Sequence, residues 1–424
     1  MLIGWLVVLF LVLLALNIPV CFVLLMISTV YVFVKDVPLT VLGHVLTTST
    51  DSFILTAIPL FVLAAYMMDK GDVSNRIIDF SRDLVGHLPG GLAHVNVVAN
   101  MIVAGMSGSA LADAGGIGVV AVKMMRRGGY DDDFTAAITA SASIIGPIIP
   151  PSIPLVLYGA IARESVGKLF LGGAIPGVLV GISLMIYIYI TAGKRNYPVT
   201  PRPTAREILQ HCRRVFLPIL TPFIILGGIV GGFFTPTEAA AVACLYAFIL
   251  GRFIYKAMSW KDCFKAFFDT ALLTGVVVFI MGMAALWSWM ITSEGVATLL
   301  VEYMTTLTKD PLVMLFLMNI ILLILGCFIE PLAIMIMVLP VFLPILEAYK
   351  ISTLHFGVVM TLALMIGLLT PPFGECLFLL SAITGLPVGR VAAAVAPCLI
   401  YIIAVLVLIT VFPGFVTWLP NLLM

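Results

Sequence analysis

Long apolar runs recur along the whole chain, and they limit the possible folds more than any other feature. Windows of about 18 or more apolar residues follow one another, with short polar stretches between them. Of the 424 residues, 62% are hydrophobic and 10% are charged, whereas a soluble domain carries about 25% charged residues. Because each crossing of a lipid bilayer needs about 20 residues, the sequence predicts an all-α, polytopic membrane protein.

Charge and motif content exclude several classes of protein. The net charge of +1 and the absence of a basic stripe predict no nucleic-acid partner. The seven cysteines are scattered without a CxxC pair, so neither a disulfide framework nor a metal cluster is expected. The chain contains neither HExxH nor GxxxxGK followed by Ser or Thr, which are the signatures of zinc proteases and ATPases. We expect no organic cofactor.

The distribution of basic residues orients the chain in the membrane. The richest basic stretch, Lys194 to Arg214, is predicted to be a cytoplasmic linker. Residues 73–88 would form either an interfacial amphipathic helix or an ordinary loop. Residues 1–34 would form two short helices broken near Asn17, which places both termini outside. Counting outward from the linker predicts membrane spans at residues 52–69, 134–162, 171–193, 215–233, 237–256, 270–293, 356–383 and 391–416.

Two further apolar segments, about 93–122 and 312–346, do not fit one span each. Both are about 30 residues long, and polar or small residues interrupt both in the middle. If either crossed the membrane completely, the orientation derived from the basic residues would fail. The orientation is preserved if each segment enters and leaves the membrane on the same side, so we predict two re-entrant helical hairpins. The first would open inward and the second outward.

The two halves of the chain also resemble each other when one is shifted by 221 residues. Opposite orientations of the two halves then predict an inverted-topology repeat, which is typical of secondary transporters. Residues 1–193 would form the first repeat and 215–424 the second, on either side of the linker 194–214. The matching pairs are Gly105 with Gly326, Gly146 with Gly367, Pro150-Pro151 with Pro371-Pro372, and Pro176 with Pro397.

Four helix-breaking stretches would meet near the middle of the membrane. They are GMSGS (105–109), GPIIPPSIP (146–154), GCFIEP (326–331) and LLTPPFGEC (368–376). Irregular backbone survives at that depth only where it is buried in protein or lines a cavity. Its free carbonyls and hydroxyls suit a hard cation such as Na⁺. The sequence therefore predicts two discontinuous helices, 134–162 and 356–383, two pseudo-symmetric cation sites and a substrate cleft between them.

Three carboxylates fall inside the predicted membrane region: Asp113, Glu330 and Glu375. Ionisable residues at such depth are candidates for ion or substrate binding. The alternative is a structural role as a helix cap or buried partner. Asp113 lies in the first turns of its half-helix, where a negative charge is favoured in any case.

Several motifs resemble the large membrane subunit of TRAP (tripartite ATP-independent periplasmic) transporters, and the likeness covers nearly the whole chain. The motifs are IPLFVLAAYMMDKG (58–71), GHLPGGLAHVNVVANMIVAGMSGSALAD (86–113), IIGPIIPPSIPLVLYG (144–159), KLFLGGAIPG (168–177), GGFFTPTEAAAVACLYA (231–247) and GLLTPPFGECLF (367–378).

This resemblance implies an elevator-type, ion-transporter-like fold. It also implies that a Na⁺ gradient drives transport, with at least two Na⁺ ions per cycle. It also implies two partners, a small four-helix membrane subunit and a periplasmic substrate-binding protein. The expected cargo is a small carboxylate such as a C4-dicarboxylate or sialic acid. The expected location is the bacterial inner membrane, as a multi-pass protein.

The resemblance also assigns roles to residues. The family more often has Asp where Glu330 stands, and often Asn around Glu375. The Glu375 carboxylate would alter cargo preference, even toward a substrate that carries an amine. The expected Na⁺ ligands are Ser107, Gly108, Ser109, Gly146, Ile149, Pro150, Glu330, Thr370, Pro371 and Gly374. The expected substrate contacts are Ser109, Asp113, Ser152, Glu330, Thr370 and Glu375.

Two rival functions remain at this stage. GMSG matches the GxSG of rhomboid-type intramembrane proteases, with Ser107 as nucleophile and His355 as the candidate base. The inverted repeat is not explained by that function. The second rival is a stand-alone ion-coupled elevator carrier that needs no binding protein.

Overall fold

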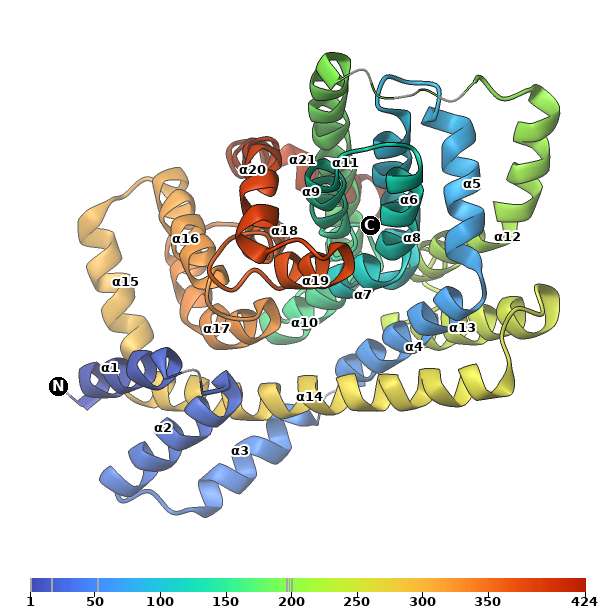
Figure 1. The fold of residues 1–424 in the computed structure, drawn as a ribbon. Helices are drawn as coiled ribbons and strands as arrows, with labels where there is room; N and C mark the ends of the chain where they lie inside the picture. Colours follow the sequence, from blue (N-terminus) through green and yellow to red (C-terminus); the bar gives the residue numbers. More distant parts are fainter. Residues whose placement is uncertain (1, 17, 52, 196, 198, 200) are drawn as a thin grey trace.

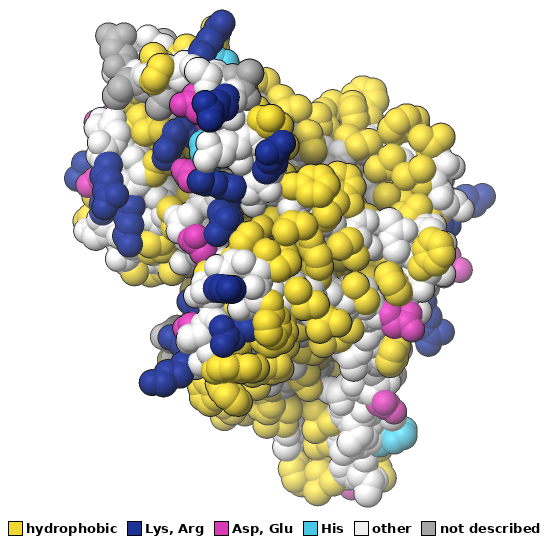
Figure 2. All heavy atoms as spheres, turned by 90° about the vertical axis from the view of Figure 1, so that its right-hand side faces the viewer, with side chains coloured by type: hydrophobic (Ala, Val, Ile, Leu, Met, Phe, Trp, Pro, Cys, Tyr) yellow, Lys and Arg dark blue, Asp and Glu magenta, His cyan; other side chains and the backbone are white. Residues whose placement is uncertain are grey.

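The computed structural model describes residues 2–16, 18–51, 53–195, 197, 199 and 201–424, and this part of the chain is helical without strands. Within these described residues, seven helical segments are long and apolar enough to cross a membrane. Hydrophobic side chains cover much of the face in Figure 2, and Lys and Arg side chains gather on one part of it. The seven segments are Phe53–Lys70, Val166–Gly193, Arg206–Val230, Pro236–Ile254, Trp260–Ser293, Pro331–Ala348 and Val388–Val411.

A long helix, α14 (Trp260–Ser293), runs along one edge of the molecule and organises a group of helices that we call the scaffold (Figure 1). The predicted span began only at residue 270, but a capping box at Ser259 and Asp262 starts this helix earlier. The other scaffold helices pack on α14 or on α4: α2 (Val20–Val34), α3 (Thr40–Thr50), η1 (Phe53–Thr56), α4 (Ala57–Lys70) and α13 (Pro236–Ile249), which continues into the π-helix η2 (Leu250–Ile254).

The N-terminal region forms two short helices, as predicted, because α1 (Leu2–Ala15) ends before α2 begins at Val20. Pro19 lies directly before α2, where the fixed φ of proline suits a helix start. Asn17, where the break was predicted, lies outside the described residues. α3, between α2 and α4, had no counterpart in the predicted spans.

Both predicted hairpins are present. The first consists of α6 (Gly91–Ser107), α7 (Ala110–Gly115) and α8 (Ile117–Arg127), and the second of α16 (Pro311–Gly326) and α17 (Pro331–Ala348). Each breaks at the stretch where glycine and polar residues interrupt the apolar run. The first hairpin has a second interruption at Gly116, so its returning arm consists of two helices rather than one.

Both predicted discontinuous helices are also present. α9 (Asp132–Ser143) and α10 (Ile153–Ala162) form the first, and α18 (Thr353–Gly367) and α19 (Glu375–Thr384) the second. The breaks coincide with the paired prolines, which remove backbone donors and cannot continue a helix. The Pro150-Pro151 and Pro371-Pro372 peptide bonds are cis. Together with the hairpins, these helices form what we call the hairpin unit.

Other elements correct or complete the predicted map. α5 (Val73–Val85) is a helix, so the loop interpretation of residues 73–88 is wrong. α12 (Ala205–Val230) begins with a capping box at Thr204 and Glu207, so the second part of the predicted linker 194–214 is helical. The remaining helices are α11 (Val166–Arg195), α15 (Val296–Leu307), α20 (Val388–Val411) and α21 (Gly414–Leu423).

Ion pairs outside the spans join segments that are distant in sequence. Arg390 at the start of α20 binds Asp133 through two bonds, Nε to Oδ1 at 2.7 Å and Nη2 to Oδ2 at 2.9 Å. This pair puts the loops before α9 and before α20 at the same end of the molecule, as the predicted orientation requires. At the end of α14, Glu294 accepts a bond from Lys35 at 2.7 Å, and this contact lowers the pKa of Glu294 and raises that of Lys35.

Candidate functional site

The tip of the first hairpin packs directly against the first helix break. Gly108 follows α6 with φ of +63°, a conformation that glycine adopts readily. A Cβ atom at this position would lie 2.6 Å from the carbonyl oxygen of Pro151. The Ile153 amide donates to the Gly108 carbonyl at 3.3 Å. The close approach and the bond fix the hairpin tip against the start of α10.

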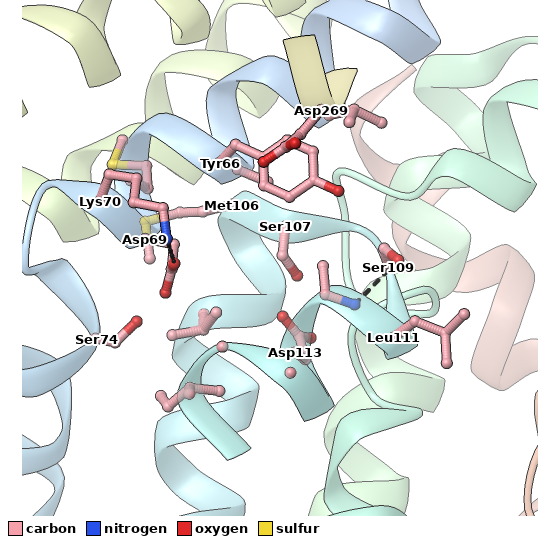
Figure 3. A pocket seen from close by; sticks show the side chains of 18 of the residues that line it. Tyr66, Asp69, Lys70, Ser74, Met106, Ser107, Ser109, Leu111, Asp113 and Asp269 are labelled. Carbon is pink, nitrogen blue, oxygen red and sulfur yellow. Dashed lines mark hydrogen bonds and ion pairs between the residues drawn. The ribbon is translucent and has the colours of Figure 1, made fainter. Parts of the chain in front are cut away.

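A carboxylate without a protein partner lies behind this tip. Asp113 is only 1% exposed, and neither of its oxygens has a hydrogen-bond partner among the described residues. The Ser107 hydroxyl is also buried and unpaired. Figure 3 shows the Asp113 carboxylate pointing toward Ser107. Its Oδ2 lies so close to Gly146 that a Cβ there would be 2.1 Å away. Buried charges require a partner, so this group of oxygens could hold a cation.

The second hairpin tip follows the same plan with different chemistry. Glu330 caps α17, and its carboxylate accepts a bond from the Ala333 amide at 2.9 Å. Ser109 caps α7 and accepts from the Ala112 amide at 3.4 Å. Both caps satisfy N–H groups that a helix start leaves free. The two caps correspond in the internal repeat, because Glu330 and Ala333 follow Ser109 and Ala112 by 221 residues each, the offset that relates the two halves.

The second tip also contacts its own helix break. The Phe373 amide donates to the Cys327 carbonyl at 3.0 Å. A Cβ on Gly367 would lie 2.6 Å from the Gly326 carbonyl oxygen, so these two glycines allow the backbones of α16 and α18 to touch. The Thr370 hydroxyl donates to the Ile366 carbonyl at 2.8 Å, so it caps α18 from its C-terminal end.

Two adjoining cavities lie at the boundary between the hairpin unit and the scaffold, where α17 also packs directly on α14 and α6 on α4. The central cavity, of about 200 Å³, lies between both hairpin tips and α4 and α14, and Ser109, Glu330 and Glu375 contribute its polar side chains. The vestibule, of about 490 Å³, lies between the first hairpin and the scaffold. Both cavities are lined by Ser109 and Ile153, so they adjoin at the first tip.

The predicted site residues are distributed unevenly over these features. Of the predicted substrate contacts, Ser109, Glu330 and Glu375 line the central cavity, and Asp113 lines the vestibule together with Ser107. Neither cavity is lined by Ser152, which is buried, caps α10 and bonds the Pro147 carbonyl. Gly108, a predicted ion ligand, lines the central cavity. The remaining predicted ion ligands lie in the helix breaks and line neither cavity: Gly146, Ile149, Pro150, Thr370, Pro371 and Gly374.

Sequence reasoning missed the scaffold side of the vestibule. Tyr66, Asp69 and Lys70 of α4 line it, as do Lys265 and Asp269 of α14 (Figure 3). Asp69 and Asp269 lie at the ends of apolar runs, where a charged residue is expected at the end of a helix and does not indicate a binding site. Their closeness to the first hairpin follows from packing between segments distant in sequence, for which the residue pattern holds no signal.

The protease interpretation finds no support at Ser107. Its hydroxyl has no hydrogen-bond partner among the described residues. The proposed base, His355, is buried in α18, and its Nε2 is bonded to the Ile409 carbonyl at 2.8 Å. Serine catalysis needs a base within hydrogen-bond reach of the nucleophile.

Paired hairpins, broken helices and a cavity between them define a polytopic membrane transporter. The fold is similar to that of the Alcanivorax borkumensis YdaH transporter, with a TM-score of 0.64 and 16% identity over 89% of this chain and 88% of that one. It is also similar to Neisseria gonorrhoeae MtrF, with a TM-score of 0.57 and 11% identity over 89% and 85% of the two chains.

The chain belongs to the family described as "Tripartite ATP-independent periplasmic transporter, DctM component", whose model matches residues 7–415. It is a transporter subunit rather than an enzyme, and a multi-pass protein of the bacterial inner membrane.

Three curated relatives are about two fifths identical to this chain over the aligned residues. The sialic acid TRAP transporter large permease protein SiaM of Vibrio cholerae is 43% identical over 88% of this chain and 87% of its own length. The sialic acid TRAP transporter permease protein SiaT of Haemophilus influenzae is 44% identical over 88% of this chain, which spans 61% of that relative. The C4-dicarboxylate TRAP transporter large permease protein DctM of Pseudomonas aeruginosa is 40% identical, with 88% and 87% covered.

Proposed function

We propose that this chain is the large permease of a three-part system that takes up an organic acid, sialic acid or a C4-dicarboxylate, driven by a Na⁺ gradient. The single observation that carries the coupling is the buried Asp113 carboxylate, whose two oxygens have no partner among the described residues. A permanently unpaired charge at such depth would be costly, whereas a bound cation would satisfy it.

Two Na⁺ sites are proposed, one at each hairpin tip. The first would use the Ser107 and Asp113 side chains with carbonyls of the first break near Gly146. The second would use Glu330 with carbonyls of the second break near Thr370. Oxygen-rich breaks of this kind suit Na⁺, which is a hard cation. The cargo carboxylate would lie in the central cavity, near the starts of α7 and α17, where helix N-termini favour an anion.

An elevator movement of the hairpin unit against the scaffold is the proposed mechanism. In support, the two halves of the hairpin unit pack on each other, α10 against α17 and α19 against both α7 and α9. The Ser143 hydroxyl also contacts the Cys376 sulfur at 3.7 Å between the two breaks. The two cavities lie on the boundary with α4 and α14. The hairpin unit, whose helices pack on one another and which borders these cavities, can therefore move as one body.

Two partners are proposed with this function, a small membrane subunit and a periplasmic substrate-binding protein. The support is the family itself, whose description is tripartite and periplasmic. The Haemophilus influenzae relative is longer than this chain, and the alignment covers 61% of it. The name of that relative therefore describes a longer protein than the part aligned with this chain.

The test is uptake into liposomes that contain the full chain and its two proposed partners, measured against Na⁺ concentration. Ser107→Ala removes the hydroxyl of the first proposed site and Glu330→Ala removes the carboxylate of the second, so we expect the half-saturating Na⁺ concentration to rise by roughly threefold to tenfold in each. The control is Glu347→Ala, at the exposed end of α17.

Two results would contradict this proposal. An unchanged Na⁺ dependence in both tip variants would remove the assigned ion sites. Full-rate uptake by the purified chain alone would instead favour a stand-alone carrier.

A further inference from the structure

The charged side chains that line the central cavity are all acidic. Glu330 and Glu375 line it, and none of its described lining residues is Lys, Arg or His. The nearest lysines, Lys70 and Lys265, line the vestibule but not the central cavity. A purely anionic cargo would therefore meet like charges without a protein cation to offset them.

The Glu375 carboxylate does not cap the helix that it begins. Glu375 is the first residue of α19, a position where a carboxylate often caps free amides. Here those amides have backbone partners, because Cys376 donates to the Leu368 carbonyl at 3.2 Å and Leu377 to the Gly374 carbonyl at 2.7 Å. No hydrogen bond or ion pair joins the Glu375 side chain to another described residue. Glu330 differs, since it caps α17.

The two proposed Na⁺ ions would neutralise two of the three carboxylates at the hairpin tips and the second break, and one carboxylate would remain without a cation. Asp113, buried and unpaired, faces the vestibule and would be neutralised by the first Na⁺. Glu330 would be neutralised by the second. Glu375 then remains as a partly buried charge in the cavity that holds the cargo. A charge in such a place needs a partner of opposite sign.

Building on the proposed transport function, we propose that Glu375 binds a positively charged nitrogen of the cargo. The central cavity would then select zwitterions, which carry an ammonium group beside a carboxylate or sulfonate. The anionic end would lie toward the helix starts and the bound Na⁺, and the ammonium toward Glu375. This makes Glu375 a specificity-determining residue.

The experiment uses two pairs of compounds that differ only in a hydroxyl or an ammonium group, malate with aspartate and isethionate with taurine. Binding to the purified full chain in lipid nanodiscs is titrated in Na⁺ buffer, for the wild type and for Glu375→Gln. We expect the ammonium compound of at least one pair to bind about tenfold more tightly to the wild type. In Glu375→Gln this preference should disappear while the Na⁺ dependence of binding remains. The control Glu347→Gln, on the exposed end of α17, should keep the wild-type ratio.

Three results would overturn the inference. Equal binding within both pairs in the wild type is one, and an unchanged ratio in Glu375→Gln is another. The third is a change in Na⁺ dependence without a change in the ratio, since Glu375 would then serve a further cation. Na⁺-dependent binding of the hydroxyl compounds in any of these cases leaves the transport function standing. Absence of binding by all four compounds would also overturn the inference and, because sialic acid is not among them, would leave the transport function standing.

Discussion

The two hairpin tips occupy matching positions in the chain, yet the first is enclosed and the second is open. Residues 144–148 of the first break are fully buried, whereas Pro371, Pro372 and Phe373 of the second are exposed. The carboxylate behind the first tip, Asp113, has no protein partner, and the one at the second, Glu330, caps a helix. The same backbone plan thus produces one buried carboxylate without a hydrogen-bond donor among the described residues and one that a backbone amide supports.

The largest expected effect compares the two carboxylates directly. Asp113→Asn and Glu330→Gln each remove a charge while keeping the side-chain shape. We expect Asp113→Asn to raise the half-saturating Na⁺ concentration of uptake by about tenfold or more, and Glu330→Gln by only about threefold. The reason is that the enclosed Asp113 has no amide donor or solvent to replace the cation.

Asp36→Asn is the matched control for these two variants, because Asp36 is exposed and its φ of +54° is one that asparagine tolerates. Equal shifts in Asp113→Asn and Glu330→Gln would show that enclosure does not distinguish the two tips.

An intermediate effect compares the repeat-related glycines Gly146 and Gly367. In Gly367→Ala the new Cβ would lie 2.6 Å from the Gly326 carbonyl oxygen, so the backbone itself must move. We expect a loss of about 1–3 kcal/mol in the free energy of unfolding, seen as a lower melting temperature in detergent. In Gly146→Ala the obstacle is the Asp113 carboxylate, a side chain that can rotate. That variant should lose Na⁺ affinity more than stability, and the reverse pattern would contradict the comparison.

The smallest effect concerns an exposed ion pair that joins the two halves of the chain. Arg390→Gln breaks the two bonds to Asp133, and the pair is solvent-exposed. We expect a loss of no more than about 1 kcal/mol in stability, since exposed ion pairs contribute little. The difference in melting temperature from the wild type should shrink in about 1 M NaCl. The Na⁺ dependence of uptake should stay unchanged, and a shift would mean that the tips are coupled through this pair.

Local chemistry explains why the breaks were predictable from sequence. Paired prolines cannot continue a helix, and Gly108 adopts a left-handed conformation that glycine tolerates. Both signals are contained in a few neighbouring residues. The orientation of the chain in the membrane was also predicted from the basic residues alone, and it stays a prediction.

Other features depend on contacts between distant segments, and these were missed. The packing at Gly116 is one example, because a Cβ there would lie 3.2 Å from the Asp69 carboxylate of α4, as well as 2.9 Å from the Ala112 carbonyl oxygen of its own turn. The wall of the vestibule, with Lys265 and Asp269, is another, because the predicted span began only after both residues. Whether Glu375 caps a helix or faces a cavity was equally unreadable, since its neighbours' amides find partners by tertiary folding.

The length of α14 has a consequence for the surrounding lipid. Its 34 residues, at about 1.5 Å each, make a rod of about 51 Å, whereas the apolar layer of a bilayer is only about 30 Å thick. Such a rod leans by roughly 50°, or the layer thickens around it, or its first turns, which carry Lys261, Asp262, Lys265 and Asp269, extend beyond the layer. In the proposed elevator movement, a hairpin unit that slides along a leaning α14 travels sideways as it travels inward. Lipids on its flank would then be displaced in every transport cycle, and uptake should depend on membrane thickness.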